Sequence, residues 1–292
     1  MNLTHHSEYG QLKTVYLQHI TNGFISQEFI SKQWNELNYI GEPQYDIALK
    51  EYAEFEALIS SGGVDVSYFE SYPSLSIDSI YCRDSSIVTD FGIILCNMGK
   101  EARKNEPQAV EASYQSHRQN ILGKISSPGT VEGGDVCWID KSTLAVGHSY
   151  RTNMEGINQL KALLEPHGIR ILIVDLPHYK GPSDVFHLMS ILSPVDKDLM
   201  VVYSPLMPIS FRNTLIDMGN SLIEVPEKEF DSMGCNVLAI APRKCVMVDG
   251  NPISKLKLEE AGATVHTYQG LELSVKGGGG PTCLTRPLLR EL

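Results

Sequence analysis

The chain repeats one pattern five times: a segment of helical periodicity ends at a glycine, and an apolar, β-rich run follows within a few residues. Glycine is favoured just past a helix because it reaches the left-handed conformation without a Cβ clash. Successive glycines lie 60, 45, 51 and 43 residues apart, a ragged repeat of about 50 residues. The glycines and the runs after them are Gly63 before 64–69, Gly123 before 124–125, Gly168 before 169–174, Gly219 before 221–225 and Gly262 before 264–268.

Two helices and three hairpins can be located in more detail. Apolar residues at helical spacing predict helices over 45–59 and 155–164. Pairs of short apolar runs joined by polar, Gly or Pro turns predict hairpins between the repeats. The apolar positions are Ile47, Tyr52, Phe55 and Leu58 in the first helix and Ile157, Leu160 and Leu164 in the second; the paired runs are 86–89 with 93–96, 136–139 with 143–146, and 237–240 with 245–248.

Together these patterns predict an α/β fold with a pseudo-fivefold repeat of one helix and about three strands. No Ser/Pro-rich linker or charge-block shift divides the chain, so residues 1–292 are expected to form a single domain. A closed ring of five such units would leave a concave, polar-lined centre as the natural pocket. A doubly wound parallel sheet fits less well, because the hairpins imply much antiparallel pairing.

Composition narrows the function classes. The chain has 292 residues, 42% of them hydrophobic, and a formal net charge of −11, which makes a nucleic-acid partner unexpected. The first residues lack the basic and apolar regions of a signal peptide, and the apolar runs are too short to span a bilayer. We therefore expect a cytoplasmic protein with no membrane partner. The sequence leaves open whether it forms a homodimer.

One of the six cysteines stands apart from the others. Cys283 follows four consecutive glycines, Gly277 to Gly280, and a Pro-Thr pair. Four glycines in a row are costly in folding entropy unless the backbone turns sharply or approaches another group closely. A thiol at the end of such a loop is a candidate nucleophile, although a flexible tail would look similar. The remaining cysteines are scattered without metal-ligand spacing and are expected to be small buried apolar groups.

For the other candidate residues, the neighbouring sequence is compatible with a functional role and with a purely structural one. His187 follows a Gly-Pro turn and begins an apolar stretch, so it is either a proton carrier or a core or capping histidine. Glu132 and Asp135 flank a Gly pair before an apolar run, which would also suit a plain acidic turn. Asp78 and Asp84 lie six residues apart around an apolar run that we interpret as a strand, where alternation would put both on one face. Arg103 and Arg151 are isolated cations near turns.

Taken in order, these residues resemble those of one family. The motifs are Asp78 with Arg83-Asp84, Met98-Gly99 with Arg103 and Glu106, Glu132-Gly133-Gly134-Asp135, 147–153, His187-Leu188-Met189-Ser190, and 277–285 around Cys283. Over roughly residues 10–290 they are similar to the guanidine-modifying (pentein) superfamily, specifically to dimethylarginine dimethylaminohydrolases and arginine deiminases. The resemblance implies a five-bladed α/β propeller, in agreement with the five repeats. Arginine deiminases carry an extra helical domain, so the length matches the compact dimethylargininase-like branch.

The resemblance also implies an activity and a role for each residue. It assigns Cys283 as nucleophile, His187 as general acid and then base, and Glu132 as the carboxylate beside His187 and the substrate. Asp78 and Asp84 would bind guanidinium nitrogens. Ser190 belongs to the histidine motif and is included in the substrate site. Arg103 and Arg151 match positions that bind an α-carboxylate, which implies a free guanidino or ureido amino acid as partner. The reaction would be hydrolysis through an amidino-cysteine, with no metal or other cofactor.

Departures from the family pattern leave the substrate open. Two residues after the histidine, arginine deiminases carry an acid and dimethylargininases usually a lysine, whereas this chain has Met189. Dimethylargininases also have an aspartate about five residues before the cysteine, where this chain has Gly278. Dimethylarginine, arginine, another N-substituted arginine and citrulline are therefore all candidates. An amidinotransferase and a non-enzymatic binding propeller are the competing functions. Residues 19–45 are expected to form a lid, or else an ordinary long connection containing a short helix.

Overall fold

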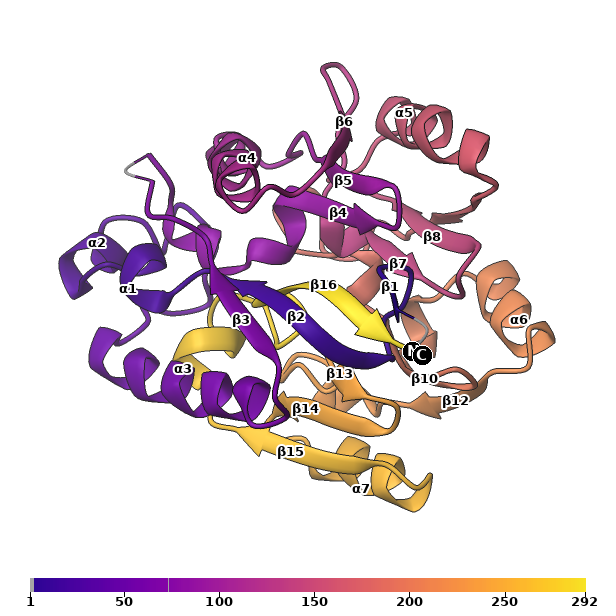
Figure 1. The fold of residues 1–292 in the computed structure, drawn as a ribbon. Helices are drawn as coiled ribbons and strands as arrows, with labels where there is room; N and C mark the ends of the chain where they lie inside the picture. Colours follow the sequence, from indigo (N-terminus) through magenta and orange to yellow (C-terminus); the bar gives the residue numbers. More distant parts are fainter. Residues whose placement is uncertain (1–2, 73) are drawn as a thin grey trace.

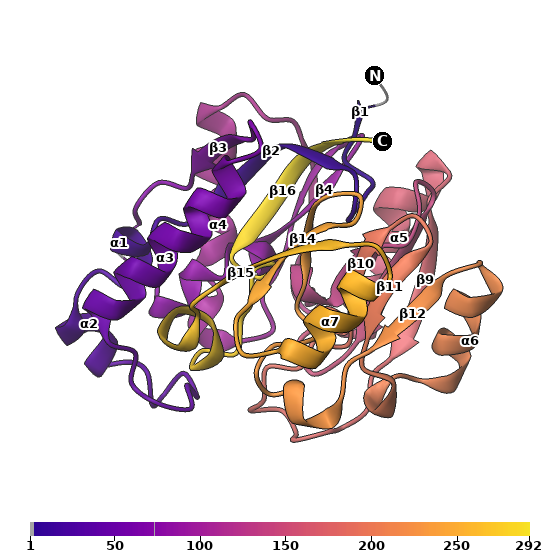
Figure 2. The same ribbon diagram turned by 90° about the horizontal axis from the view of Figure 1, so that it is seen from below.

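The computed structural model describes residues 3–72 and 74–292 and consists of five small sheets arranged as a ring. Figure 1 shows the sheets around a central axis, with the long helices on the outer rim and the two chain ends side by side. Seen from below, the same helices lie outside the strands (Figure 2). Five α/β units in a closed ring are the predicted five-bladed propeller, so the fold prediction is confirmed.

Each blade has the same local topology. An antiparallel strand pair is followed by a helix, and the strand after that helix adds in parallel to the second strand of the pair. A parallel connection needs such a crossover, and this accounts for the helix–Gly–strand order of the sequence. Four blades run consecutively: β4 (Ser86–Thr89), β5 (Gly92–Leu95), α4 (Glu106–Ser116), β6 (Ile121–Lys124); β7 (Val136–Trp138), β8 (Thr143–His148), α5 (Met154–Leu164), β9 (Arg170–Asp175); β10 (Leu192–Asp196), β11 (Leu199–Val202), α6 (Ile209–Asp217), β12 (Ser221–Glu224); β13 (Leu238–Ala241), β14 (Lys244–Val248), α7 (Pro252–Glu260), β15 (Thr264–Tyr268).

The fifth blade joins the two ends of the chain and so closes the ring. The C-terminal strand β16 (Thr285–Glu291) pairs antiparallel with β2 (Gln11–Leu17), and β2 pairs parallel with β3 (Asp65–Tyr68). The short strand β1 (Leu3–Thr4) adds to the other edge of β16. Between β2 and β3 lie α1 (Ile20–Gly23), α2 (Gln27–Ser31) and the long helix α3 (Tyr45–Ser60). Because β16 begins two residues after Cys283, ring closure fixes the position of the cysteine loop.

Four of the five glycine predictions are confirmed and one is wrong. Gly63, Gly168, Gly219 and Gly262 all have a positive φ between 71° and 88° and precede the third strand of their blades. Gly123 instead lies within β6, where a Cβ would meet Leu163. Helix α4 ends earlier, and Arg118, with φ 57°, takes the left-handed position there.

The helix and hairpin predictions are also largely confirmed. All three predicted hairpins form antiparallel pairs, with strand ends within a residue or two of the expected positions. In α5, Ile157, Leu160 and Leu164 are fully buried, as expected. In α3 the buried face is rotated slightly: Tyr52 and Phe55 are buried, whereas Ile47 is 41% exposed. The cause is that α3 packs on the turn Leu271–Val275 as well as on the sheet, and this contact buries Glu51.

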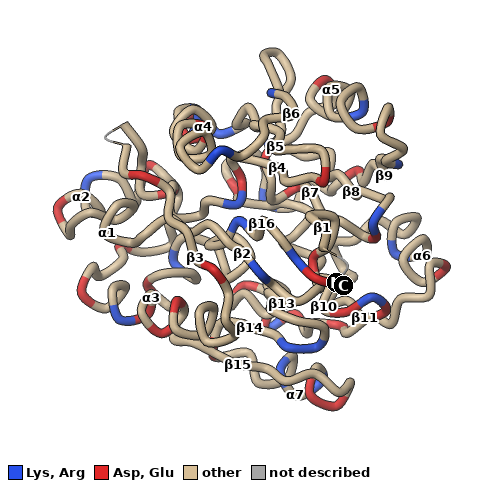
Figure 3. The backbone as a smooth tube through the Cα atoms, in the orientation of Figure 1, with Lys and Arg blue, Asp and Glu red and all other residues tan. Residues whose placement is uncertain are grey.

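Acidic residues outnumber basic ones, 35 to 24, which gives the formal net charge of −11. Figure 3 shows basic residues dispersed among acidic ones around the rim. Among the described residues, no helix is both long enough and apolar enough to cross a bilayer.

Candidate active site

The cysteine loop lies at the hub of the ring and requires glycine for steric reasons. A Cβ on Gly277 would collide with the Tyr81 hydroxyl and one on Gly279 with the Tyr81 ring, and a Cβ on Gly280 would stand 2.6 Å from the Asn236 side chain. Gly278 has a φ of 74°, a conformation that disfavours any other residue. The four glycines therefore let the chain turn against Tyr81 and Asn236. Cys283 follows as the one cysteine of the six that is only partly buried.

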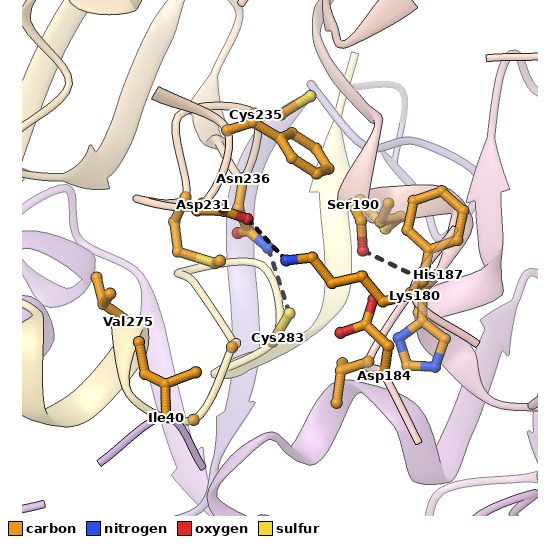
Figure 4. A pocket seen from close by; sticks show the side chains of 18 of the residues that line it. Ile40, Lys180, Asp184, His187, Ser190, Asp231, Cys235, Asn236, Val275 and Cys283 are labelled. Atoms are coloured by element: carbon orange, nitrogen blue, oxygen red, sulfur yellow. Dashed lines mark hydrogen bonds and ion pairs between the residues drawn. The ribbon is translucent and has the colours of Figure 1, made fainter. Parts of the chain in front are cut away.

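A cavity of about 440 Å³ contains both Cys283 and His187 in its wall. Figure 4 shows the two side chains entering this space from different loops. A smaller cavity of about 20 Å³ adjoins it and shares Val185, His187, Gly277, Gly278 and Cys283 with it. Both cavities have charged walls: the smaller one is lined by Asp78, Asp84, Lys100, Arg103 and Arg151, and the larger one by Arg83, Lys180, Asp184, Asp231 and Lys276. Ser190 lines only the larger one.

His187 is held by two carboxylates. It precedes a 3-10 turn, Leu188–Ser190, and its Nε2 lies 2.8 Å from Oε2 of Glu132. Asp135 accepts a hydrogen bond from the Leu188 amide at 3.0 Å and thereby fixes the same turn. The Ser190 hydroxyl accepts one from the His187 amide at 3.1 Å. A Cβ at Gly134 would stand 2.5 Å from Nδ1, so the glycine pair leaves the second ring nitrogen unobstructed.

The charges around His187 favour its protonated form. Burial alone would lower the pKa of His187, but the carboxylates of Asp84, Asp135 and Glu132 outweigh this effect and raise the pKa to about 9. Burial alone would raise the pKa of Glu132, but the hydrogen bond from His187 and the nearby arginines keep this pKa below its ordinary range. At neutral pH the pair is therefore an imidazolium and a carboxylate.

The surroundings of Cys283 favour the neutral thiol over the thiolate. Burial, together with the negative charge of Asp84, raises the pKa of this thiol above its ordinary value. Hydrogen bonds from Asn236 and Thr282 act against that rise, and the Asn236 amide lies 3.3 Å from the sulfur. A cation bound beside Asp84 would cancel part of the negative charge and favour the thiolate.

Asp78 and Asp84 come together, although not on a strand as predicted. Their segment forms two consecutive 3-10 turns, Ile77–Ile80 and Cys82–Ser85. Because such turns hold about three residues each, positions six apart again face the same way. Asp78 pairs with Lys100 at 2.6 Å, and Asp84 accepts from the Gly134 amide at 2.8 Å and from Arg103. The strand interpretation is wrong, and the shared face is retained.

The two arginines are buried and differ in their free donors. Arg103 donates to Asp84, to both carboxylate oxygens of Glu106 and to the Tyr81 carbonyl, which leaves one N–H of its Nη1. Arg151 makes only a long hydrogen bond of 3.3 Å to the Asp184 carbonyl and a contact of 3.6 Å with Glu132. Arg151 is therefore the arginine with more guanidinium N–H donors available to a ligand.

The segment 19–45 contributes to the larger cavity. It contains α1 and α2, and Asn38 and Ile40 lie in the cavity wall. Its chain is tied down from both sides: Lys100 donates to the Leu37 carbonyl, and Lys276 to the Glu42 carbonyl, each at 2.9 Å. The segment is therefore both a long connection and part of the cavity wall.

The acidic cluster could also hold a cation. Asp84, Glu132 and His187 each place one ligand atom within 4.8 Å of the other two. The same convergence of buried carboxylates suits an organic cation, and His187 already directs its Nε2 at Glu132. Hydrogen-bond geometry around a planar guanidinium requires several acceptors of this kind.

Sequence reasoning missed Asn236, Lys100 and the positioning role of Asp135. Asn236 stands just before β13, and its Oδ1 accepts from the backbone amide and hydroxyl of Thr282 at 3.0 and 2.9 Å. It therefore fixes the cysteine loop and contacts the sulfur at once. A polar residue directly before a predicted strand was the available signal, but nothing in the sequence linked it to a loop 47 residues away.

Replacing Asn236 should change the ionisation of Cys283. In Asn236→Ala the donor to the sulfur is lost, so we expect the pH profile of alkylation by iodoacetamide to move to higher pH and the rate at neutral pH to fall about tenfold. Asn236→Asp, which retains the acceptor to Thr282 but adds a negative charge, should move the profile further. An unchanged profile in both variants would show that the amide has no influence on the thiol.

A cysteine, a histidine and carboxylates converge at the centre of a fivefold α/β ring. With this geometry, the family match and the named relatives identify the chain as a guanidine-modifying enzyme of the pentein superfamily. Within that class, residues 21–290 match the family described as N,N dimethylarginine dimethylhydrolase, eukaryotic. The chain belongs to this family.

Individual relatives agree with this membership. The chain is 27% identical to the N(G),N(G)-dimethylarginine dimethylaminohydrolase of Pseudomonas aeruginosa over 85% of its own length and 91% of that protein. It is 26% identical to the arginine deiminase of Latilactobacillus sakei subsp. sakei over 96% of its length and 82% of that protein.

Solved structures show the same fold. A mutant of the Pseudomonas aeruginosa dimethylarginine dimethylaminohydrolase in complex with citrulline superposes with a TM-score of 0.76 at 23% identity, covering 94% of this chain and 98% of that one. An amidinotransferase of the saxitoxin pathway from Microseira wollei gives a TM-score of 0.78 at 18% identity, covering 98% and 97%. At these identities the likeness concerns the fold alone.

Proposed function

We propose that the protein hydrolyses the guanidinium group of a free, arginine-like amino acid through a covalent intermediate on Cys283. The observation that carries the proposal is the shared cavity of Cys283 and His187, with Glu132 bound to the histidine and two further carboxylates beside it. A guanidinium carbon is a weak electrophile because its charge is delocalised over three nitrogens. It needs both a strong nucleophile and acceptors that hold the cation in place.

The first half of the reaction uses His187 as an acid. Substrate cation beside Asp84 and Asp78 displaces Lys100 from Asp78 and favours the Cys283 thiolate. The sulfur attacks the guanidinium carbon, the imidazolium of His187 gives its proton to the departing nitrogen, and the C–N bond breaks to release an amine or ammonia. Carbon remains bound to sulfur as an amidino-cysteine, and His187 is left neutral.

The second half uses the same histidine as a base. Neutral His187 takes a proton from water while the oxygen adds to the amidino carbon. The C–S bond then breaks, which restores the thiolate and releases a ureido amino acid. Glu132 stabilises each imidazolium form through its contact with Nε2. If an amine attacked the amidino carbon in place of water, the same intermediate would lead to amidino transfer.

Product analysis tests the activity and separates it from the competing functions. Arginine, N-methylated arginines, agmatine and citrulline are incubated with enzyme, and released ammonia, methylamines and ureido products are measured by mass spectrometry. We expect a ureido amino acid from at least one guanidino substrate, and none with Cys283→Ser. A new guanidino compound on adding an amine would instead indicate amidino transfer. The absence of both turnover and Cys283 labelling by a haloacetamidine would favour a binding protein.

Arg151 is proposed to bind the substrate α-carboxylate, with Arg103 holding Asp84 in place. Loss of a charge-assisted contact in Arg151→Ala should raise KM for the amino acid about 30-fold or more, with a smaller effect on kcat. Agmatine lacks the carboxylate, so its kinetics should hardly change. The exposed Arg170→Ala on β9 serves as control. An equal loss with both substrates would mean that Arg151 acts on Glu132 instead.

A further inference from the structure

The smaller cavity is lined by reacting groups of the proposed mechanism but is too small for the substrate cation. Cys283, His187, Asp78 and Asp84 all lie in its wall. Its volume of about 20 Å³ suffices for about one water molecule. A guanidinium group consists of a carbon and three nitrogens and so needs several times that space. A group in the wall must therefore move before a guanidinium can lie beside these carboxylates and the sulfur.

Lys100 is the wall group that already places a cation there. Its Nζ lies 2.6 Å from Oδ2 of Asp78 and donates to the Leu37 carbonyl at 2.9 Å. The pair is well shielded from solvent, with 13% of the Lys100 side chain and 5% of the Asp78 side chain exposed. Over residues 3–72 and 74–292, no other cation is paired with Asp78. Because a buried carboxylate needs a partner for its charge, the ammonium of Lys100 takes the role at Asp78 that a guanidinium would take.

Lys100 is held less firmly than the other cation that pairs with a carboxylate in this cavity. Arg103, the cation at Asp84, also donates to both carboxylate oxygens of Glu106. Lys100 has a single carboxylate partner, and its ammonium lies at the end of a flexible four-carbon stem. Its backbone is held separately, because its amide donates to Oε1 of Glu132 at 2.9 Å. The ammonium can therefore leave its carboxylate while the backbone beside Glu132 stays in place.

We infer that Lys100 is a built-in competitor of the substrate, whose ammonium occupies the place of the guanidinium beside Asp78 and must withdraw before the substrate binds. This inference rests on the proposed function and adds to it a control on substrate affinity. The exchange conserves the charge at the carboxylate, because one cation replaces another. Substrate binds only to molecules in which the pair is open. A pair that is open in about one molecule in ten raises the apparent Kd about tenfold.

Binding to the Cys283→Ser protein, which lacks the nucleophile, tests the inference. Calorimetry with arginine and Nω-methylarginine gives Kd for this variant and for the double variant that also carries Lys100→Met. We expect Kd to fall about tenfold in the double variant, because methionine has no charge to hold it at Asp78. Damage to the site would weaken binding, whereas the loss of a competitor strengthens it. Lys100→Arg keeps a cation at Asp78 and should restore the weaker binding. An unchanged or higher Kd with Lys100→Met would overturn the inference.

A second lysine supplies the matched control. Lys276 donates to the Glu42 carbonyl at 2.9 Å and pairs with Glu272 at 2.6 Å, so it ties down the same segment 19–45 without pairing with Asp78. We expect Lys276→Met not to strengthen binding. An equal gain in affinity in both lysine variants would assign the effect to loosening of the segment and contradict the inference.

Turnover separates this inference from the proposed function. With Cys283 intact, Lys100→Met should lower KM about tenfold and change kcat less than about threefold, because the competitor is absent from the bound complex. Tighter binding in the Lys100→Met variant without any ureido product from the wild type would contradict the proposed hydrolysis and leave the inference standing. If neither arginine nor Nω-methylarginine binds to any of these variants, both are overturned.

Discussion

Cys283→Ser is expected to lower kcat by on the order of 10⁴-fold or more while the fold is retained. A serine hydroxyl is far less ionised than a thiol, and the carboxylates beside the loop would oppose its ionisation further. The side chain differs by one atom, and the glycine turn that presents it contacts Tyr81 rather than the sulfur. Stability should therefore change little. The measurement is turnover in parallel with thermal unfolding.

Cys235 provides the control for this experiment. It lines the same cavity, but its side chain is buried and directed at the Val201 carbonyl, and burial raises its pKa far above the ordinary value. We expect Cys235→Ser to retain activity within a few-fold and to be labelled normally by a haloacetamidine. Mass spectrometry should find the label on Cys283 alone. Activity that survives in Cys283→Ser but is lost in Cys235→Ser would show that Cys235, and not Cys283, is the nucleophile.

The fold could be predicted because its signals are local. Glycine in the left-handed conformation, as at Gly168, terminates a helix whatever the rest of the chain does. Two short apolar runs joined by a polar turn likewise predict a strand pair such as β7 with β8. The prediction of a helix end at Gly123 was wrong because glycine is also used where a neighbouring side chain, here Leu163, comes close to the backbone. The sequence does not distinguish this use from a helix end.

The sequence alone points to a site residue only where its immediate neighbours are unusual. Cys283 is marked in this way by the four glycines before it, whereas His187 and Glu132 were assigned roles from the resemblance to a family and not from their own surroundings. Asn236 and Lys100 act across the ring on residues far away in sequence. Such pairs arise from blade packing, which local patterns do not encode.

The electrostatics of the site follow from burial rather than from composition. A net charge of −11 says nothing of where the acids lie, yet three of them surround His187 and raise its pKa to about 9. Asp84, one of these acids, also raises the pKa of Cys283, as burial does, and so opposes its ionisation. His187 is therefore an acid ready for the leaving group, and Cys283 is a nucleophile that becomes reactive when a cation binds beside Asp84. This coupling ties catalysis to the charge of the substrate.

Glu132→Gln should move the alkaline limb of the pH–rate profile. His187 must be protonated for the first step, and with a pKa of about 9 this form is lost as the pH rises through 9, so kcat/KM should fall there. Glutamine removes the charge and the charged hydrogen bond at Nε2, while Asp84 and Asp135 remain. We expect the limb to shift down by about one pH unit and kcat at the optimum to fall about 100-fold.

The same substitution should also change how the free energy of unfolding depends on pH. A histidine whose pKa is raised from 6.5 to about 9 contributes stability that is complete below pH 6.5 and lost as the pH rises through 9. Glu132, with a lowered pKa, contributes stability above its ordinary value of 4.5 that is lost as the pH falls below it. In Glu132→Gln both dependences should flatten. The control is His148→Asn, which breaks a similar histidine–carboxylate pair, to Asp175 at 2.9 Å, on the surface. If wild type and Glu132→Gln share one alkaline limb, a group other than His187 is the acid.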